Sequence, residues 1–191
     1  IKKPVLVFIT NVDWAFVSHR IPIALEAIKK GFEVHLISKR TDCGSYLKDQ
    51  GIIFHDWDLN RSSLNPFLIL SNIFQLYSLI KKIRPNILHA ITIKPILMSG
   101  IIRIFLKPIP TIYAVAGLGY AFNSKTIKTI IIKNLSILFF KLTFRSKNTH
   151  VIFQNNEDLN KILKISNLKR ENFTLIPGSG IDLNYFKPNK F

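Results

Sequence analysis

The chain has 191 residues, 48% of them hydrophobic, which is the composition of one folded domain with a substantial core and not of a disordered protein. Its single cysteine, Cys43, excludes an internal disulfide framework. The 27 lysines and arginines outnumber 11 acidic residues, and the formal charge of +16 favours an anionic partner such as a lipid surface, a nucleic acid or a phosphorylated substrate.

Short apolar strands alternate with helical patterns along the chain, which is typical of βαβ units and a parallel sheet. The strands are expected at 4–10, 33–38, 52–57, 87–91, 111–115, 150–154 and 173–176. The helices are expected at 19–30, 43–50, 67–83, 95–106, 125–145 and 156–165. We therefore predict the α/β class, with a single Rossmann-like, doubly wound parallel sheet of about seven strands.

The first connection between strand and helix, residues 11–18, contains no glycine. It therefore lacks the glycine-rich turn that binds dinucleotides, and a cofactor of that kind is disfavoured. Ser18 is expected as the N-cap of the first helix and Gly31 as its left-handed end. This assignment puts His19 and Arg20 at a helix N-terminus, which is a favourable place for an anion.

Ligands of such sheets bind beyond the carboxyl ends of the strands, so the loops there carry the candidate residues. His19 and Arg20 would meet Arg61 and Lys94 from two other loops at this edge, and together these cations would suit an anionic ligand. An ion pair with Asp13 is the alternative for Arg20. The candidate substrate contacts are Asn11, Asp13, Ser18, Arg61, Lys94, Gly117, Gly119, Tyr120, Asn155 and Glu157.

A metal site is not expected. Asp56-Trp57-Asp58 would place two carboxylates on one face of a strand, as in metal-dependent sugar transferases. Such a pair is a frequent accident, and the chain has neither an H-x-x-x-H pattern nor a Cys/His cluster.

The middle of the chain is cationic and apolar, since every charged residue between Asp58 and Glu157 is basic. The uncharged apolar run at 67–80 is too short to cross a bilayer, so we expect a cytoplasmic protein without a span. Segment 125–147 combines a broad apolar surface with basic residues, which predicts a helix at the inner face of the cytoplasmic membrane. The alternative is a helix buried between the sheet and a missing partner domain. The expected membrane contacts are Lys125, Lys128, Lys133 and Lys141.

With these residues assembled, the chain resembles the N-terminal half of a family-four glycosyltransferase of the GT-B fold. It is most similar to the bacterial polysaccharide branch that includes the PglA-like sugar transferases. The matching motifs follow one another along nearly the whole chain: SHRIPIALEAIKKGFEVHLIS at 18–38, GIIFHDWDLNRSSLNP at 51–66, RPNILHAITIKP at 84–95, AVAGLGYAF at 114–122, VIFQNNEDLN at 151–160 and IPGSGIDLNYFKP at 176–188.

The resemblance implies two Rossmann-like domains that face each other across a cleft. Residues 1–176 would be the acceptor-binding domain, and 177–191 would begin the linker to a C-terminal donor domain that the chain lacks. It also implies a retaining transfer of a sugar from a nucleotide-sugar to a lipid-diphosphate-linked or polysaccharide acceptor. No cofactor is expected besides the nucleotide-sugar, which the missing domain would bind.

One motif departs from the family pattern. Many relatives carry a Phe-His-Thr-like segment after the fifth strand, with its histidine facing the reacting sugar, whereas this chain has Ala116-Gly117-Leu118-Gly119. We expect His19 with Arg20 to fill that role. The alternative reading is a basic module that binds nucleic acid without catalysis, which the absence of a recognised nucleic-acid motif disfavours.

Overall fold

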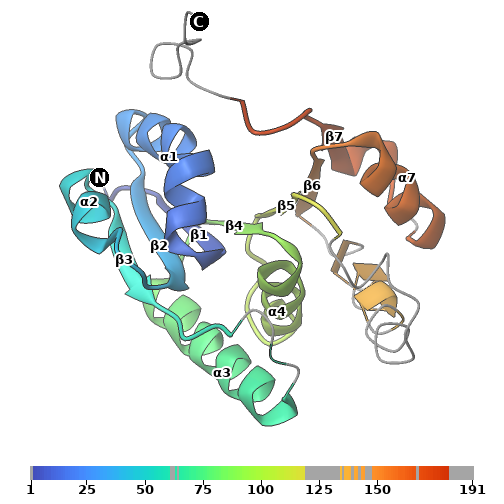
Figure 1. Cartoon of the computed structure of the whole chain (residues 1–191), viewed down its shortest axis with the longest axis horizontal. Coiled ribbons are helices and arrows are strands. Elements are labelled where there is room, and N and C mark those ends of the chain that lie inside the picture. Colours follow the sequence, from blue (N-terminus) through green and yellow to red (C-terminus); the bar gives the residue numbers. More distant parts are fainter. Residues whose placement is uncertain are drawn as a thin grey trace, which may run out of the picture.

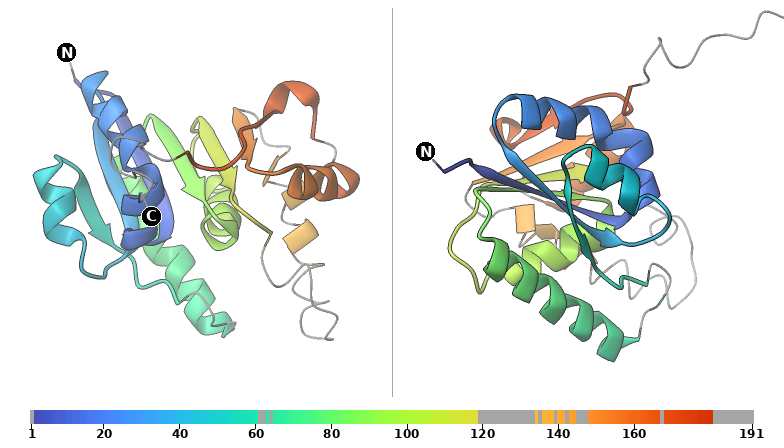
Figure 2. Two further views of the ribbon diagram at one scale, coloured as in Figure 1. Left: turned by 45° about the horizontal axis from the view of Figure 1, so that its top comes forward. Right: turned by 90° about the vertical axis from the view of Figure 1, so that its left-hand side faces the viewer.

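The computed structural model describes residues 2–60, 63, 65–118, 134, 136–138, 140–141, 143–144, 148–166 and 168–180. These ranges form one parallel sheet with helices on both of its faces (Figures 1 and 2). The strands are β1 (Val5–Val12), β2 (Glu33–Lys39), β3 (Ile53–Asp56), β4 (Ile87–Ile91), β5 (Thr111–Val115), β6 (Thr149–Phe153) and β7 (Phe173–Leu175). The helices are α1 (Asp13–Lys29), α2 (Gly44–Asp49), α3 (Pro66–Ile83), α4 (Ile93–Arg103), α7 (Asn156–Ile165) and the short 3-10 helix η1 (Arg170–Asn172).

The sheet has the strand order β3-β2-β1-β4-β5-β6-β7, and every neighbouring pair is parallel. This confirms the predicted α/β class and the doubly wound sheet of seven strands. The order reverses between β1 and β4, because β2 and β3 lie on one side of β1 while β4 begins the other side. Open α/β sheets bind ligands in the crevice that such a reversal leaves at the carboxyl ends of the strands.

Each face of the sheet has its own apolar layer, which explains the nearly continuous apolar strands. On one face, Phe16 of α1 and Leu47 of α2 pack with Phe8 of β1. On the other face, α3 and α4 contribute to a larger cluster that also includes Ile162 of α7. Figure 2 shows α1 and α3 on opposite sides of the strands.

The first helix begins six residues earlier than the sequence predicts, at Asp13 and not at 19. The carboxylate of Asp13 accepts the backbone N–H of Trp14 at 2.8 Å, so an acid in the first turn starts the helix where a loop was expected. Ser18 is therefore not the N-cap: it lies inside α1, and its hydroxyl donates to the carbonyl of Trp14 at 2.7 Å. Gly31 has a φ of +87° just after the helix, as predicted.

The expected helix at 125–145 falls within the described residues only in part. Residues 134, 136–138, 140–141 and 143–144 are helical. Phe140 and Phe144 are fully buried in the larger core cluster, with their rings 5.1 Å apart. Leu138 and Lys141 are exposed. This segment therefore packs against the core, and the aromatic rings at 140 and 144 are not a lipid-facing surface.

Within the described ranges, no helix is both long enough and apolar enough to cross a membrane.

Candidate functional site

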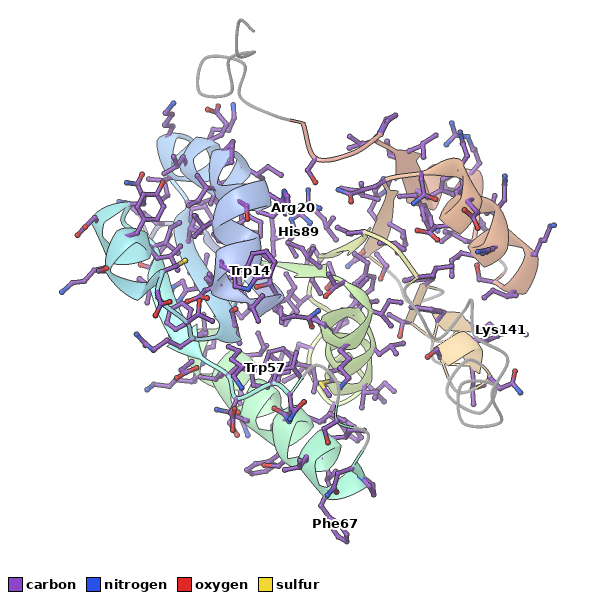
Figure 3. The ribbon with its side chains drawn as sticks, viewed as in Figure 1. Trp14, Arg20, Trp57, Phe67, His89 and Lys141 are labelled. Carbon is purple, nitrogen blue, oxygen red and sulfur yellow. The ribbon has the colours of Figure 1, made fainter. Side chains whose placement is uncertain are left out.

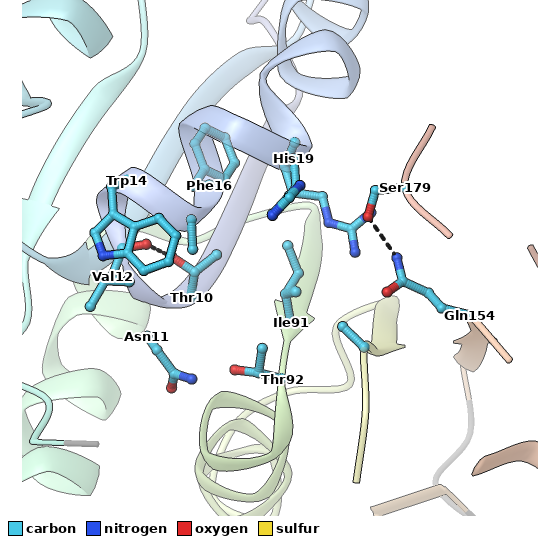
Figure 4. A pocket seen from close by; sticks show the side chains of 13 residues that line it. Thr10, Asn11, Val12, Trp14, Phe16, His19, Ile91, Thr92, Gln154 and Ser179 are labelled. Atoms are coloured by element: carbon cyan, nitrogen blue, oxygen red, sulfur yellow. Dashed lines mark hydrogen bonds between the residues drawn. The ribbon is translucent and has the colours of Figure 1, made fainter. Parts of the chain in front are cut away.

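A cavity of about 350 Å³ opens at the carboxyl edge of the sheet, where β1 and β4 separate (Figure 4). Asn11 and Val12 line it from β1, while Ile91 and Thr92 line it from the end of β4. The first turns of α1 add another wall, and this wall includes the predicted pair His19 and Arg20. The remaining lining residues are Thr10, Trp14, Ala15, Phe16, Ala116, Gln154 and Ser179.

Arg20 gives this cavity a buried positive charge. Its side chain is only 8% exposed, and burial lowers the pKa of the guanidinium, which still keeps its proton at neutral pH. Within the described part of the chain, Arg20 forms no ion pair, and its Nε has no hydrogen-bond partner. Because an unpaired buried cation is costly, the site favours an anion that would neutralise it.

His89 of β4 lies beside Arg20 on the same face of the sheet (Figure 3). Its ring is 5.1 Å from the ring of Phe8, its side chain is 5% exposed, and its Nε2 lacks a partner among the described residues. Burial and the charge of Arg20 lower the pKa of His89 to about 3, so this imidazole is neutral at physiological pH. Arg20, not His89, therefore supplies the charge here.

Two more polar atoms are buried at the cavity without a described partner, Asn11 Oδ1 and Thr92 Oγ1. Thr92 also has a φ of +71° and a ψ of 163°, which is unfavourable backbone for a β-branched residue. Buried polar atoms normally find partners, and strained backbone persists where the surrounding structure imposes it. The end of β4 is therefore held in a strained conformation, in which the hydroxyl of Thr92 has no partner among the described residues.

The far wall of the cavity comes from the end of the described chain. After β7, residues 176–180 run back across the carboxyl edge of the sheet toward α1 (Figure 1). Gln154 fixes this segment, because its side-chain amide donates to the carbonyl of Gly178 at 3.2 Å and to the hydroxyl of Ser179 at 3.0 Å. Ser179 thus faces the same cavity as His19.

The alternative partner of Arg20, Asp13, is fully buried and makes other contacts. One carboxylate oxygen accepts the backbone N–H of Thr41 at 2.8 Å, and the other accepts the hydroxyl of Thr41 and the N–H of Trp14. Asp13 therefore connects α1 to the segment after β2, and it neither lines the cavity nor pairs with Arg20.

Lys94 lies close to this edge but does not line the cavity. Its ammonium group donates to the carbonyls of Asn60 and Ser63, at 2.7 and 2.8 Å, and burial lowers its pKa. Through these hydrogen bonds, Lys94 holds the segment after β3 against the start of α4.

Three other predicted contacts that the structure describes, Asn155, Glu157 and Gly117, do not line the cavity. Asn155 is the N-cap of α7, where its Oδ1 accepts the N–H of Asp158 at 2.7 Å. Glu157 is exposed and pairs with Lys161 at 2.6 Å. Gly117 has a φ of +119° beyond β5. The predicted contacts Arg61, Gly119, Tyr120, Lys125, Lys128 and Lys133 lie outside the described residues.

The described residues contain no group of three or more histidine, cysteine, aspartate or glutamate side chains that could hold a metal ion. The two acids around Trp57 instead contact cations, since Asp56 pairs with Arg40 and Asp58 with Lys39, each at 3.6 Å. Trp57 itself is fully buried, and its indole N–H donates to the carbonyl of Asn72.

Of the residues predicted from the sequence, Asn11, His19 and Arg20 line the cavity, whereas Trp14, Thr92 and the other lining residues were not predicted. The missed residues follow the strands directly, so their position at the carboxyl ends was an available signal for Trp14, Thr92 and Gln154. Ser179 reaches the site only because a later segment folds back, which no local pattern indicates.

A family model described as "Glycosyl transferase 4-like" matches residues 5–155. The chain belongs to the glycosyl transferase 4-like family. This confirms the resemblance to a family-four N-terminal domain of the GT-B fold that the motifs indicated. The residues matched include β1, α1 and the end of β4, so most of the cavity lies in the part that the family shares.

Similar proteins agree with this glycosyl transferase 4-like assignment. The chain is 26% identical, over 182 residues, to the N,N'-diacetylbacillosaminyl-diphospho-undecaprenol alpha-1,3-N-acetylgalactosaminyltransferase of Campylobacter jejuni; the match covers 95% of this chain and 48% of that protein. It therefore spans about half the length of this relative.

Two solved structures share the fold. A glycosyltransferase from Rickettsia africae has a TM-score of 0.68 at 19% identity, with 100% of this chain and 47% of that one covered. A sucrose-phosphate synthase from Thermosynechococcus elongatus has the same TM-score at 13% identity, with 97% and 50% covered. At these identities the likeness concerns the fold alone.

Proposed function

We propose that this chain is the acceptor-binding half of a retaining glycosyltransferase, which moves a sugar from a nucleotide-sugar to a lipid-diphosphate-linked or polysaccharide acceptor. Residues 1–176 would form the acceptor domain, and 177–191 would lead into a donor-binding domain. Membership of the glycosyl transferase 4-like family and the similarity to a transferase named for a diphospho-undecaprenol acceptor support this proposal.

The observation that carries the proposal is the buried charge of Arg20 at the topological switch point. Diphosphate is common to the nucleotide-sugar and to the lipid-linked acceptor, and it is an anion of the kind that this cavity favours. The guanidinium can donate two parallel hydrogen bonds to phosphate oxygens, while His19 lines the same wall.

In the proposed reaction, the bond between the anomeric carbon and the donor diphosphate breaks, the acceptor oxygen bonds to that carbon, and the hydroxyl proton passes to the departing diphosphate. Negative charge grows on the leaving diphosphate as its bond breaks. Cationic groups fixed in a partly buried site stabilise such charge without having to reorganise. Arg20 would supply this stabilisation, and His19 would face the reacting sugar in place of the histidine that the segment after β5 lacks. The nucleotide-sugar would be the co-substrate, bound mainly by the donor domain, and no further cofactor is proposed.

We also propose that the protein works peripherally at the inner face of the cytoplasmic membrane. The support from the structure is an apolar surface on α3, defined here as Phe67, Leu68, Leu70 and Phe74, whose side chains are 81%, 45%, 65% and 70% exposed. Phe67 lies at the far end of α3 and points away from the body of the protein (Figure 3). Exposed apolar clusters of this kind mark interaction surfaces, and anionic lipid would suit the excess of basic charge, including the exposed Lys141.

The diphosphate proposal is tested by titrating the chain with inorganic pyrophosphate and comparing wild type with Arg20→Met. Charge-assisted hydrogen bonds contribute about 1.5–3 kcal/mol each, so the substitution should weaken binding by about tenfold or more. Arg20→Lys keeps the charge but loses the paired donors, and an intermediate affinity is expected.

The matched control is Lys30→Met, which removes one positive charge from the other end of the α1 region. Lys30 is exposed and contacts Glu26, far along the helix from the cavity. If Lys30→Met weakens pyrophosphate binding as much as Arg20→Met, binding reflects net charge alone and the proposed site is wrong.

A further inference from the structure

The cavity has two chemically different parts. Trp14 and Asn11 lie on one side and His19, Gln154 and Ser179 on the other, with Ile91 and Thr92 between them (Figure 4). Arg20 follows His19 in α1 and lies apart from Trp14 (Figure 3), so we assign the charge of the cavity to the second side. We call the first side, together with Thr10 and the adjacent Thr92, the neutral side, because none of these lining residues is charged.

The neutral side combines an aromatic surface with unpaired hydrogen-bonding atoms. Trp14 lines the cavity and is 50% exposed, although a side chain of this size is usually covered. Asn11 Oδ1 can only accept a hydrogen bond, whereas Thr92 Oγ1 can donate and accept. The hydroxyl of Thr10 already donates to the carbonyl of Val12 at 3.2 Å, so it is less available.

This combination narrows the chemistry of a ligand. Asn11 Oδ1 and Thr92 Oγ1 are already buried without a described partner, so a ligand hydroxyl that pairs with them gains free energy that a purely apolar group would not. An anionic group placed here, in addition to the one at Arg20, would meet the side-chain oxygen Oδ1 of Asn11, which repels negative charge. A pyranose ring fits both requirements, because one of its faces is lined by C–H groups while its rim carries hydroxyls that donate and accept.

We propose that the neutral side binds the pyranose ring of a glycosyl phosphate, with the C–H face of the ring on the indole of Trp14 and ring hydroxyls bonded to Asn11 and Thr92. The phosphate of the same ligand would meet Arg20, and this part of the inference rests on the proposed function. Trp14, Asn11 and Thr92 are then specificity-determining residues that select a sugar attached to phosphate over phosphate alone.

The test compares three probes on the 191-residue chain: N-acetylglucosamine 1-phosphate, inorganic phosphate and uridine 5′-monophosphate. The glycosyl phosphate should bind about tenfold or more tightly than phosphate, because stacking and two hydrogen bonds add to the same anion contact. In Trp14→Ala, the affinity for the glycosyl phosphate should fall to the affinity for inorganic phosphate, and the binding of inorganic phosphate should not change. Trp14→Tyr should restore most of the difference.

Two isosteric variants test the polar contacts separately. Asn11→Leu and Thr92→Val remove the amide and the hydroxyl with little change of volume. Each should weaken the glycosyl phosphate about three- to tenfold and leave inorganic phosphate unaffected. Because Trp14 and Asn11 are not fully buried, their replacement should leave the fold intact, which thermal unfolding can verify.

Fluorescence gives an independent readout, because the chain has only two tryptophans and Trp57 is fully buried. Adding the glycosyl phosphate should change the emission of wild type, and Trp14→Phe should bind the ligand without this change.

The inference is overturned if wild type binds glycosyl phosphate and inorganic phosphate with equal affinity, or if Trp14→Ala leaves both affinities unchanged. It is also overturned if uridine monophosphate binds more tightly than the glycosyl phosphate and loses this affinity in Trp14→Ala. These results differ from failure of the proposed function, in which Arg20→Met would not weaken the binding of inorganic phosphate.

Discussion

The guanidinium of Arg20 lies beside the imidazole of His89, and among the described residues neither group has an acidic partner. Arg20 comes from α1 and His89 from β4, so the pair joins the two elements that border the topological switch point. The fold stabilises this arrangement by keeping His89 neutral, since two adjacent buried cations would repel each other.

Acid should destabilise the protein through His89. Its pKa falls from the ordinary 6.5 to about 3 on folding, so between these values the unfolded chain binds a proton that the folded chain does not. The unfolding free energy should therefore fall by ~1.4 kcal/mol per pH unit below 6.5, with the loss complete near pH 3 and no effect of this group at higher pH.

Urea denaturation between about pH 7 and about pH 5 measures this slope before most carboxylates titrate. The variant His89→Gln has no titratable group at this position. Its unfolding free energy should therefore depend less steeply on pH than that of wild type, by the contribution of His89. An identical slope in wild type and His89→Gln would contradict the burial of a neutral imidazole.

Thr92 should respond differently to glycine and to alanine. Both substitutions remove the hydroxyl, but only glycine adopts a φ of +71° without strain. We expect Thr92→Gly to be more stable than Thr92→Ala by ~1 kcal/mol, as measured by chemical denaturation. If Thr92→Ala were the more stable variant, the end of β4 would not be strained in solution.

Gly100 and Thr143 should be coupled. A Cβ at Gly100 would overlap the side chain of Thr143, with its Cγ2 only 2.7 Å away, so α4 approaches the helical residues around 143 as closely as a glycine allows. Gly100→Ala should cost about 1–3 kcal/mol of stability. In a double-mutant cycle, Thr143→Ala should recover part of this cost, and purely additive effects would exclude the contact.

The apolar surface of α3 should bind lipid. In flotation with vesicles of phosphatidylcholine and phosphatidylglycerol, the double variant Phe67→Ser, Phe74→Ser should lose membrane binding by about tenfold or more, since two exposed aromatic side chains are removed. The matched control replaces Ile23 and Tyr46, which are 44% and 42% exposed on α1 and α2.

Equal loss of lipid binding in both double variants would show that no particular surface is used. Lys141→Glu tests the electrostatic contribution, which added salt should also reduce. Tighter binding to an oligonucleotide than to vesicles would favour the nucleic-acid alternative.

The sequence predicts the sheet well because strand signals are local. Strands at 87–91 and 111–115 were predicted with the bounds that β4 and β5 have, since turn residues and prolines border their apolar runs. The start of α1 was wrong because it depends on a distant residue: Thr41 holds the carboxylate of Asp13 in the position that begins the helix.

The place of the candidate site in the fold could be predicted from the sequence, but the full set of residues that line it could not. Parallel strands end at one edge, so the sequence predicted Asn11, His19 and Arg20 together at that edge, and in the structure all three line one cavity. The same reasoning could not show that the ammonium group of Lys94 donates hydrogen bonds to the carbonyls of Asn60 and Ser63. That contact depends on the path of the irregular segment after β3. Nor does sequence spacing indicate which polar atoms remain unpaired.

Because β1 passes into α1 without an intervening glycine loop, side chains and not main-chain amides form much of the wall of the cavity. A wall of this kind can be altered one codon at a time while the fold stays unchanged. Under the proposed function, the sugar preference of this cavity would therefore respond to single substitutions at positions such as 14 or 92, without a change of fold.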